Sequence, residues 1–314
     1  MGSGSGRTPA AQISATDVRP GRICGVTMFE LYRGQRLARG EPIPAAQMPF
    51  ADSMLEIDFA ELSDVGRVRL GNEDYLGHVA PDTSEQARNH GWLFALADGV
   101  GGQEKGEVAS RTAVETVLEG FREAARGSPL NNLLQSLVRK ANTRVLEAGM
   151  SSGMATTLVA CALRYDRAVI AHVGDSRCYL VRQKAAVMLT RDHTIANEHA
   201  RLGLMSSEDV AEAETRHILS RSLGTELSVS VEVSDHQVLP GDVLLLCSDG
   251  LHGALSSQEI AAIVSETSDV ELAARRLVAL ANEKDGGDNV TAQVVRVQNV
   301  ERVGMYRGRP YKLR

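Results

Sequence analysis

Three aspartates in this 314-residue chain stand directly after apolar segments that are typical of buried β-strands. Asp98 follows residues 92–97, Asp175 follows residues 168–174, and Asp249 follows residues 243–247 and a serine. A single aspartate next to glycine or serine is most simply a turn residue. Three of them at strand ends instead favour a group of carboxylates gathered at one edge of the core.

Carboxylates that are held close together repel one another, so a group of them requires cations. Oxygen ligands alone favour Mg²⁺ or Mn²⁺ over zinc. Two more acidic segments precede expected strands, Glu73-Asp74 before 74–79 and Asp288 before 290–297. Arg69 lies just upstream of Glu73, and an arginine can hold a phosphate through two parallel hydrogen bonds. Charge runs such as Glu73-Asp74 are usually solvated surface, so this segment alone is a weak signal.

The elements that must position these residues come as groups of strands and pairs of helices. Strand patterns cover 55–59, 74–79, 92–97, 155–165, 168–174, 178–182, 186–189, 229–238, 243–247 and 290–297. Two helices are expected after residue 97, the second with Ser128 as N-cap and Pro129 as its first residue. Capping boxes at Ser256 and Ser268 predict two more, and 195–213 is a polar helical region with weak periodicity. This order is not strand–helix alternation, so it predicts an α+β fold with two antiparallel sheets and outer helix pairs.

Six motifs in this order resemble those of the metal-dependent protein serine/threonine phosphatases of the type 2C (PPM) family, bacterial subtype. They are Arg69-x-x-Asn72-Glu73-Asp74, 97–102 (ADGVGG), Gly153-x-x-Thr156-Thr157, 173–177 (VGDSR), 248–251 (SDGL) and Asp288-Asn289-x-Thr291. The resemblance covers about 55–298. It implies a sandwich of two antiparallel sheets flanked by helix pairs, with a two-metal centre at one edge.

The resemblance also implies a role for each matching residue. Asp98, Asp249 and Asp288 would hold the first Mn²⁺ or Mg²⁺ ion, and Asp74 and the Gly99 carbonyl the second, with Asp98 bridging. Glu73 would hold a water on the metal, Asp175 with Asp249 a third and weaker ion, and Arg69 the substrate phosphate. Hydroxide made between the two metals would then attack the phosphorus in line with the leaving Ser or Thr oxygen.

One position departs from part of the family. Some members carry His where this chain has Val100, and that His is assigned as the acid for the leaving group. We therefore expect a water on the third metal to supply the proton here. The segment 195–222 is expected to be a mobile flap that tunes substrate choice, with His217 and Arg221 as candidate substrate contacts. For His193 and His199, surface exposure or local hydrogen bonding is favoured over metal binding.

Composition excludes several other classes of protein. The net charge is −6 and aromatic residues make up 4%, which argues against a nucleic-acid binder. No apolar run approaches the ~18 residues that span a bilayer, and no secretory signal is evident. The four cysteines form no CxxC pair, and three lie in strand-like runs, so reduced thiols in a cytoplasmic protein are expected.

We predict three parts: an N-terminal extension (1–53), a phosphatase domain (54–299) and a basic C-terminal tail (300–314). Internal methionines at 28, 48 and 54 leave the natural start open, and a short helix or strand around 29–37 is possible. The expected partners are phosphorylated proteins and an opposing Ser/Thr kinase, and the protein is expected to be a monomer. The alternatives are a non-catalytic binding module, which would require lost ligands, and a phosphatase for one dedicated phosphoprotein.

Overall fold

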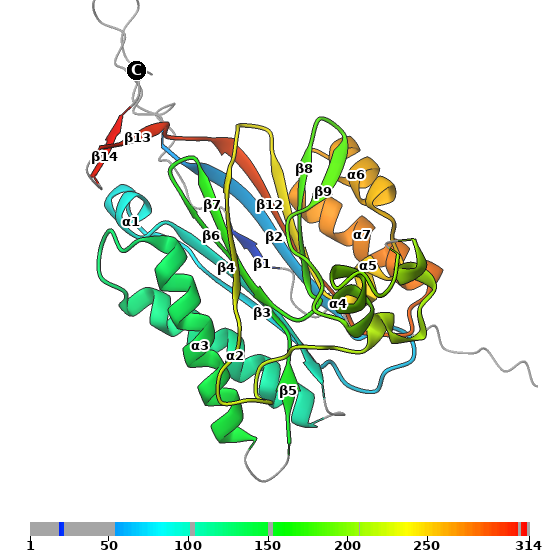
Figure 1. Ribbon diagram of the computed structural model, residues 1–314. Helices are drawn as coiled ribbons and strands as arrows, with labels where there is room; N and C mark the ends of the chain where they lie inside the picture. Colours follow the sequence, from blue (N-terminus) through cyan, green and yellow to red (C-terminus); the bar gives the residue numbers. More distant parts are fainter. Residues whose placement is uncertain are drawn as a thin grey trace, which may run out of the picture.

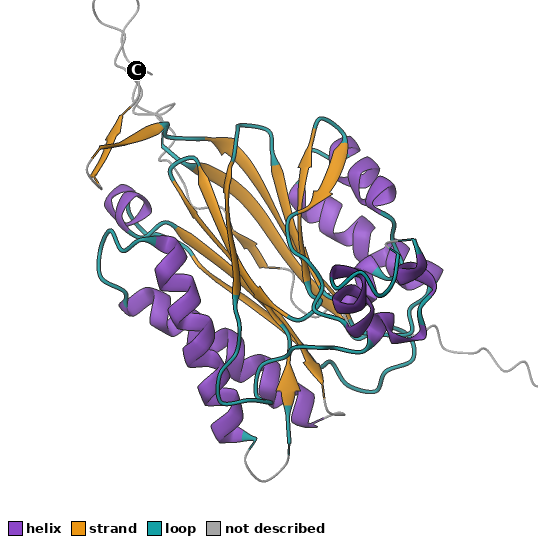
Figure 2. Ribbon diagram, in the orientation of Figure 1, coloured by secondary structure: helices purple, strands orange, loops and turns teal. Residues whose placement is uncertain are grey.

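The structure is a computed structural model that describes residues 19–21, 54–100, 104–149, 153–206, 208–306 and 309–312. Two antiparallel sheets pack face to face in the described part of the chain (Figures 1 and 2). One has the strand order β1-β2-β12-β11-β8-β9, and the other has β10-β7-β6-β4-β3 with β5 beside β4. This confirms the α+β sandwich that the sequence predicts.

The first sheet joins strands from both ends of the chain. Its members are β1 (Arg19–Gly21), β2 (Glu56–Asp64), β8 (Arg177–Arg182), β9 (Ala185–Met188), β11 (Val243–Cys247) and β12 (Val290–Asn299). The strands β11 and β12 are apolar on both faces because the other sheet covers one face and helices cover the other. The first strand of this sheet is β1, which precedes the segment where we expected the sandwich to begin, and it pairs with β2.

The second sheet carries Asp74 on its edge strand β3 and Asp98 on the neighbouring strand β4. Its members are β3 (Asp74–Val79), β4 (Trp92–Val100), β5 (Ala155–Thr156), β6 (Leu158–Arg164), β7 (Arg167–Val173) and β10 (Glu232–Gln237). The single strand expected over 155–165 is divided at Thr157. There the Thr157 hydroxyl accepts a hydrogen bond from the Asp98 amide and bonds to Ser176 instead of continuing a regular ladder.

Helix pairs cover both outer faces of the sandwich (Figure 2). The helices α2 (Glu104–Glu123) and α3 (Leu130–Ala148) bury their apolar stripes against β4, β6 and β7. The helices α6 (Ser257–Glu266) and α7 (Val270–Lys284) do the same against the first sheet. The short helices are α1 (Ser84–Asn89), which the sequence pattern did not reveal, and α5 (Asp249–His252). No described helix has the length and apolar content to cross a membrane.

Three local predictions are corrected. Helix α3 begins at Leu130 with Pro129 as N-cap, because the Pro129 backbone is extended (ψ 118°) and the Ser128 hydroxyl donates backwards to Ala125. Helix α7 is capped by Asp269 rather than Ser268, since the Asp269 carboxylate accepts from the Leu272 amide at 2.8 Å. The Ser256 capping box is confirmed.

The third correction concerns the polar region, where a continuous helix over 195–213 is wrong. It contains α4 (Ile195–Arg201) and two 3₁₀ turns, η1 (Asp209–Glu212) and η2 (Glu214–His217). Few apolar residues are spaced to bury a helical face there, so a longer helix would lack packing.

The ends of the chain lie partly outside the described residues. The possible element around 29–37 falls in residues that are not described. Cys24 is also outside them, whereas Cys161, Cys178 and Cys247 are buried free thiols, as expected. Val300 and Glu301 are buried against the sandwich, and β13 (Val303–Tyr306) and β14 (Arg309–Lys312) form a hairpin beyond them. The domain boundaries at 53 and 299 stay predictions.

Candidate active site

The two sheets bring acidic side chains together at one end of the sandwich. Asp74 and Asp98 are direct cross-strand partners in β3 and β4. Asp249 starts α5 straight after β11, and Asp288 immediately precedes β12, the neighbour of β11. Asp175 lies in the turn between β7 and β8, which connects the two sheets. The carboxylates therefore come from both layers and meet at one edge.

Asp74 is the most tightly held of these residues. Its Oδ2 accepts hydrogen bonds from Ser248 Oγ at 2.7 Å and from Thr291 Oγ1 at 2.6 Å. Its Oδ1 is buried and has no partner among the described residues. Burial raises the pKa of Asp74 to about 7, against the opposing effect of the two hydroxyl donors. A buried carboxylate oxygen with no donor is a suitable ligand atom for a hard cation.

The Asp98 and Asp249 carboxylates lie close enough to influence each other's ionisation. Burial and then the charge of Asp74 raise the pKa of Asp98 well above its ordinary value. Burial and then the charge of Asp288 raise the pKa of Asp249, whose Oδ1 is buried and has no hydrogen-bond partner among the described residues. A divalent cation would relieve the repulsion between these carboxylates.

The Asp175 turn is held in place by close backbone packing. Gly174 has φ +101°, and a Cβ there would lie 2.6 Å from the Thr157 side chain, so only glycine fits. The His252 ring bonds to the Asp175 carbonyl at 3.0 Å. Burial, followed by the charges of Asp249 and Asp192, raises the pKa of the Asp175 carboxyl to about 7.

Arg69 and Glu73 lie at the rim of the site. Arg69 Nη2 donates to Asp288 Oδ2 at 2.7 Å, and the Arg69 side chain is 48% exposed, so a phosphate can reach it. The Glu73 amide donates to Asn289 Oδ1 at 2.8 Å. A Cβ on Gly106 would lie 2.6 Å from Glu73 Oε2, so α2 passes directly beside this carboxylate.

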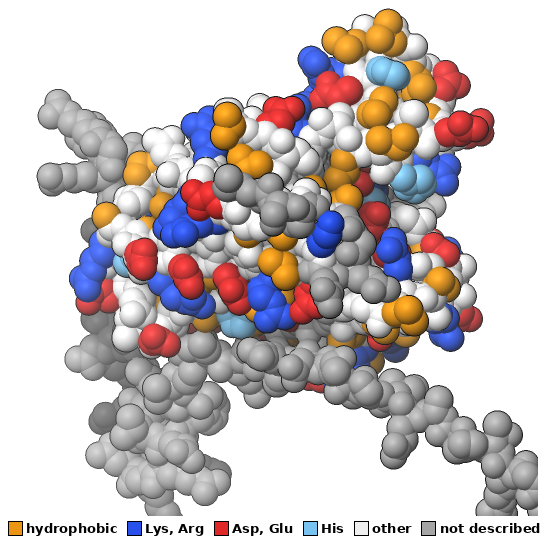
Figure 3. All heavy atoms as spheres, turned by 90° about the horizontal axis from the view of Figure 1, so that it is seen from below, with side chains coloured by type: hydrophobic (Ala, Val, Ile, Leu, Met, Phe, Trp, Pro, Cys, Tyr) orange, Lys and Arg blue, Asp and Glu red, His pale blue; other side chains and the backbone are white. Residues whose placement is uncertain are grey.

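A cavity of about 700 Å³ opens over these residues. The face seen in Figure 3 is hollowed beside a projecting lobe, and acidic side chains show within the hollow. The lining includes the predicted residues Arg69, Glu73, Asp98, Gly99, Asp175, His217, Asp249 and Asp288. Asp74 lies behind this lining, and Val100, which is 43% exposed, contributes an apolar wall with no proton to donate.

Arg221 is placed away from the cavity. Its guanidinium lies 3.1 Å from His193 Nε2 and 3.3 Å from Glu198 Oε1, at the base of the polar segment. The bridge between Thr194 and Leu219 closes that base. The structure therefore places Arg221 against the polar segment, whereas His217 lines the cavity.

Among the described residues, one group of three potential metal ligands has all its ligand atoms within 4.8 Å of one another: His172, His193 and Glu232. The predicted aspartates are more widely spread. The histidine group is already occupied by protein partners, because Arg191 pairs with Glu232 and His193 Nδ1 accepts from the Gly174 amide at 3.0 Å. Burial lowers the pKa of His193 to about 4. We interpret this group as a structural support of the polar segment.

Several supporting residues were not singled out from the sequence as site residues. Ser248 and Thr291 orient Asp74, Thr157 anchors the Asp98 amide, and Asn289 holds the Glu73 backbone. The sequence signal that could have identified Ser248 and Asn289 is their position next to an aspartate at the end of a strand.

The comparisons with known proteins agree with this geometry. The protein phosphatase 2C family matches residues 72–284. A serine/threonine phosphatase stp of Listeria innocua is 34% identical over 254 residues, covering 79% of this chain and 96% of the relative. The solved structure of the Streptococcus agalactiae serine/threonine phosphatase has a TM-score of 0.72 at 30% identity, covering 77% of this chain and all of the other. The catalytic domain of the phosphatase PstP, solved with two manganese ions, has a TM-score of 0.66 at 31% identity, covering 78% and 100%.

The fold and the site thus define a metal-dependent phosphatase of the sandwich type. The chain belongs to the protein phosphatase 2C family and is a protein serine/threonine phosphatase.

Proposed function

We propose that the protein hydrolyses phosphoserine and phosphothreonine in proteins through two bound Mn²⁺ or Mg²⁺ ions, and so reverses an opposing Ser/Thr kinase. Asp98, Asp249 and Asp288 would hold one ion, and Asp74 and the Gly99 carbonyl would hold the other, with Asp98 bridging. When bound, the ions would supply an acidified water and neutralise charge on the phosphate. The observation that carries the proposal is that Asp74 and Asp249 each have a buried oxygen with no hydrogen-bond partner among the described residues.

The chain's own residues would prepare the phosphate for attack. Arg69 at the rim would take the phosphate oxygens while keeping Asp288 oriented through its 2.7 Å contact. Glu73, which is 9% exposed, would hold a water beside the ions. Ser248 and Thr291 would keep Asp74 directed into the site, and Thr157 would fix the end of β4 through the Asp98 amide.

The leaving oxygen still needs a proton, and Val100 cannot supply one. We propose that Asp175 holds a third, weaker ion together with Asp249, and that a water there acts as the acid. The burial of Asp175 and its position in the cavity lining support this role. A phosphatase that acts on one dedicated phosphoprotein would have the same catalytic site. It would differ only in the protein that docks beside that site.

The test is metal removal and replacement. Protein stripped with EDTA should lose aryl phosphate turnover and regain it with Mn²⁺. Asp249→Asn should remain inactive with Mn²⁺, and calorimetry should show weakened Mn²⁺ binding. Asp166→Asn is the matched control, because Asp166 is also a buried aspartate but lies in the β6–β7 turn. Full activity of the stripped protein would refute the two-metal proposal.

A further inference from the structure

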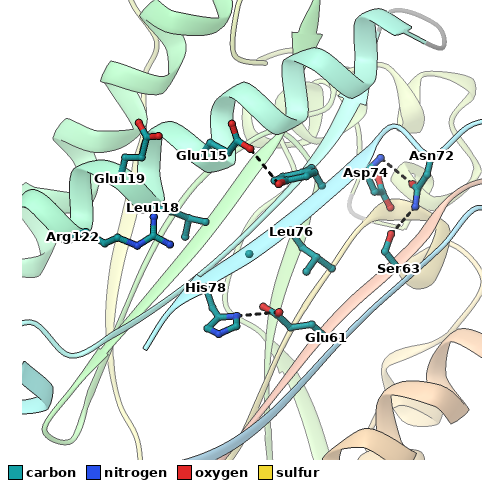
Figure 4. Close-up of a pocket in the computed structure, with 12 residues that line it drawn as sticks. Glu61, Ser63, Asn72, Asp74, Leu76, His78, Glu115, Leu118, Glu119 and Arg122 are labelled. Atoms are coloured by element: carbon teal, nitrogen blue, oxygen red, sulfur yellow. Dashed lines mark hydrogen bonds and ion pairs between the residues drawn. The ribbon is translucent and has the colours of Figure 1, made fainter. Parts of the chain in front are cut away.

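A second cavity, of about 620 Å³, runs along the outer edge of β3. Figure 4 shows β3 between Glu115, Glu119 and Arg122 of α2 on one side and Glu61 of β2 on the other. We call this cavity the β3-edge groove. It is separate from the catalytic cavity, because the two share no lining residue.

Among the described residues, no strand pairs with the side of β3 that faces this groove, where the Asp74 amide donates to Asn72 Oδ1 at 3.1 Å. The Gly99 amide donates to the Glu73 carbonyl, and the Asp98 amide donates away from β3, to Thr157. Asp74 and Asp98 are therefore a non-hydrogen-bonded pair. By alternation, Leu76 and His78 also direct their N–H and C=O groups away from β4.

The two walls of the groove differ in chemistry. On the α2 side, Glu115 and Glu119 are exposed, and neither has an ion-pair partner in the described part of the chain. On the inter-sheet side, Leu76 packs against the core between the sheets, and the His78 and Phe59 rings meet edge to face with centroids 4.5 Å apart. An added strand would point alternate side chains at these two walls.

The floor of the groove is a buried polar cluster. Glu61, which is 4% exposed, bonds to His78 Nδ1 at 3.0 Å and accepts from Gln293 Nε2 at 2.7 Å. The same Gln293 amide donates to the Gly77 carbonyl, which places it directly behind β3. Gln293 Oε1 is buried and receives no donor from the described residues. The floor thus adds acceptors to the two carboxylates of the α2 wall.

We propose that the β3-edge groove binds an extended, basic segment of a partner protein, which pairs with Leu76 and His78 as an additional strand. Basic side chains on one face of the segment would meet Glu115 and Glu119, and apolar side chains on the other face would cover Leu76. Backbone pairing would supply affinity, and the acidic wall would select the charge.

The groove ends beside the catalytic centre. Asn72 Nδ2 donates to Ser63 Oγ at 2.7 Å, Ser63 Oγ contacts Thr291 Oγ1 at 2.7 Å, and Thr291 bonds to Asp74. Asn72, Ser63 and Asp74 line the groove at this end. A partner held on β3 would therefore sit within about 20 Å of the candidate metal site, since β3 is a six-residue strand.

The test uses the full-length protein with Mn²⁺ and a fluorescein-labelled ten-residue peptide of alternating Lys and Val, followed by fluorescence polarisation. A Glu/Val peptide should bind at least about tenfold more weakly. Two further Lys/Val peptides are N-methylated, one at the odd-numbered amides and the other at the even-numbered amides. In a paired strand, one of these sets of amides would face β3 and the other would face solvent. Only the peptide whose β3-facing amides are methylated should therefore lose binding.

Variants of the protein distinguish binding in this groove from a general attraction of the basic peptide to an acidic protein. Glu119→Lys should weaken binding at least about fivefold, whereas Glu147→Lys, an exposed glutamate on α3, should not. Saturating peptide should leave aryl phosphate turnover unchanged. Equal binding by both N-methylated peptides, equal effects of the two variants, absence of binding, or competitive inhibition of turnover would each overturn the proposal. The binding measurements decide it even for an inactive enzyme.

Discussion

Replacement of Asp74 by asparagine should make the metal-free protein more stable at neutral pH while it abolishes catalysis. The Asp74 pKa rises from 3.8 to about 7 on folding, mainly through burial. Between these two values the folded state holds a proton that the unfolded state releases, so stability falls as pH rises. Over this whole pH interval, the contribution of Asp74 to the free energy of unfolding falls by about 4 kcal/mol. Asparagine keeps an acceptor for Ser248 and Thr291 but has no charge to bury.

The assay is urea unfolding in EDTA at pH 5 and pH 8, for the wild type, Asp74→Asn and the control Asp166→Asn. From pH 5 to pH 7 the Asp74 contribution falls by about 3 kcal/mol and then levels off. The difference between Asp74→Asn and wild type should therefore grow by that amount between the two measurements. Mn²⁺ at pH 8 should stabilise the wild type more than Asp74→Asn, because the variant lacks a ligand of one of the two proposed ions. An equal difference at both pH values would refute the assigned burial cost.

Three further outcomes are expected. Asp175→Ala should lower phosphoserine-peptide turnover far more than p-nitrophenyl phosphate turnover, because only the alkoxide leaving group needs a proton. Calorimetry should still count two bound ions. Equal losses on both substrates would count against an acid role. His217→Ala should alter phosphopeptide rates more than aryl phosphate rates, since His217 lines the cavity on the side of the polar segment; the reverse pattern would place His217 in the chemistry. Removal of residues 1–53 should leave aryl phosphate turnover intact and lower the unfolding temperature slightly, because β1 pairs with β2 at only three positions; a lost rate would show that the extension supports the site.

The strand-end aspartates were predictable because their position is a local property of the sequence. An apolar run that gives way to an aspartate and a glycine marks the edge of the core, so Asp98 and Asp249 could be placed there without knowledge of the fold, although β4 itself continues to Val100. Their convergence was not local, because it depends on the pairing of β3 with β4 and of β11 with β12. The resemblance to a known family supplied that step.

The errors arose where several local signals compete. Ser268 and Asp269 are adjacent, and either side chain could supply the N-cap acceptor to α7; in the structure Asp269 does so. Weak periodicity in 195–213 did not distinguish a helix from short turns, and α1 spans less than two turns, which is too short to show a period. Arg221 was singled out beside His217, but its direction depends on Glu198 and His193, which only the folded chain brings near.

The pairing of β2 with β12 has a consequence for how the protein is made. These neighbours are separated by more than two hundred residues, for example Phe59 opposite Val295. During synthesis β2 must wait for β12 to leave the ribosome, and long-range pairing of this kind is intrinsically slow. Asp288, just before β12, is the last of the predicted ligands to be made. With the proposed ligand set, a nascent chain that lacks Asp288 would have no complete cation site, so we expect no dephosphorylation until the domain has been synthesised almost to its end.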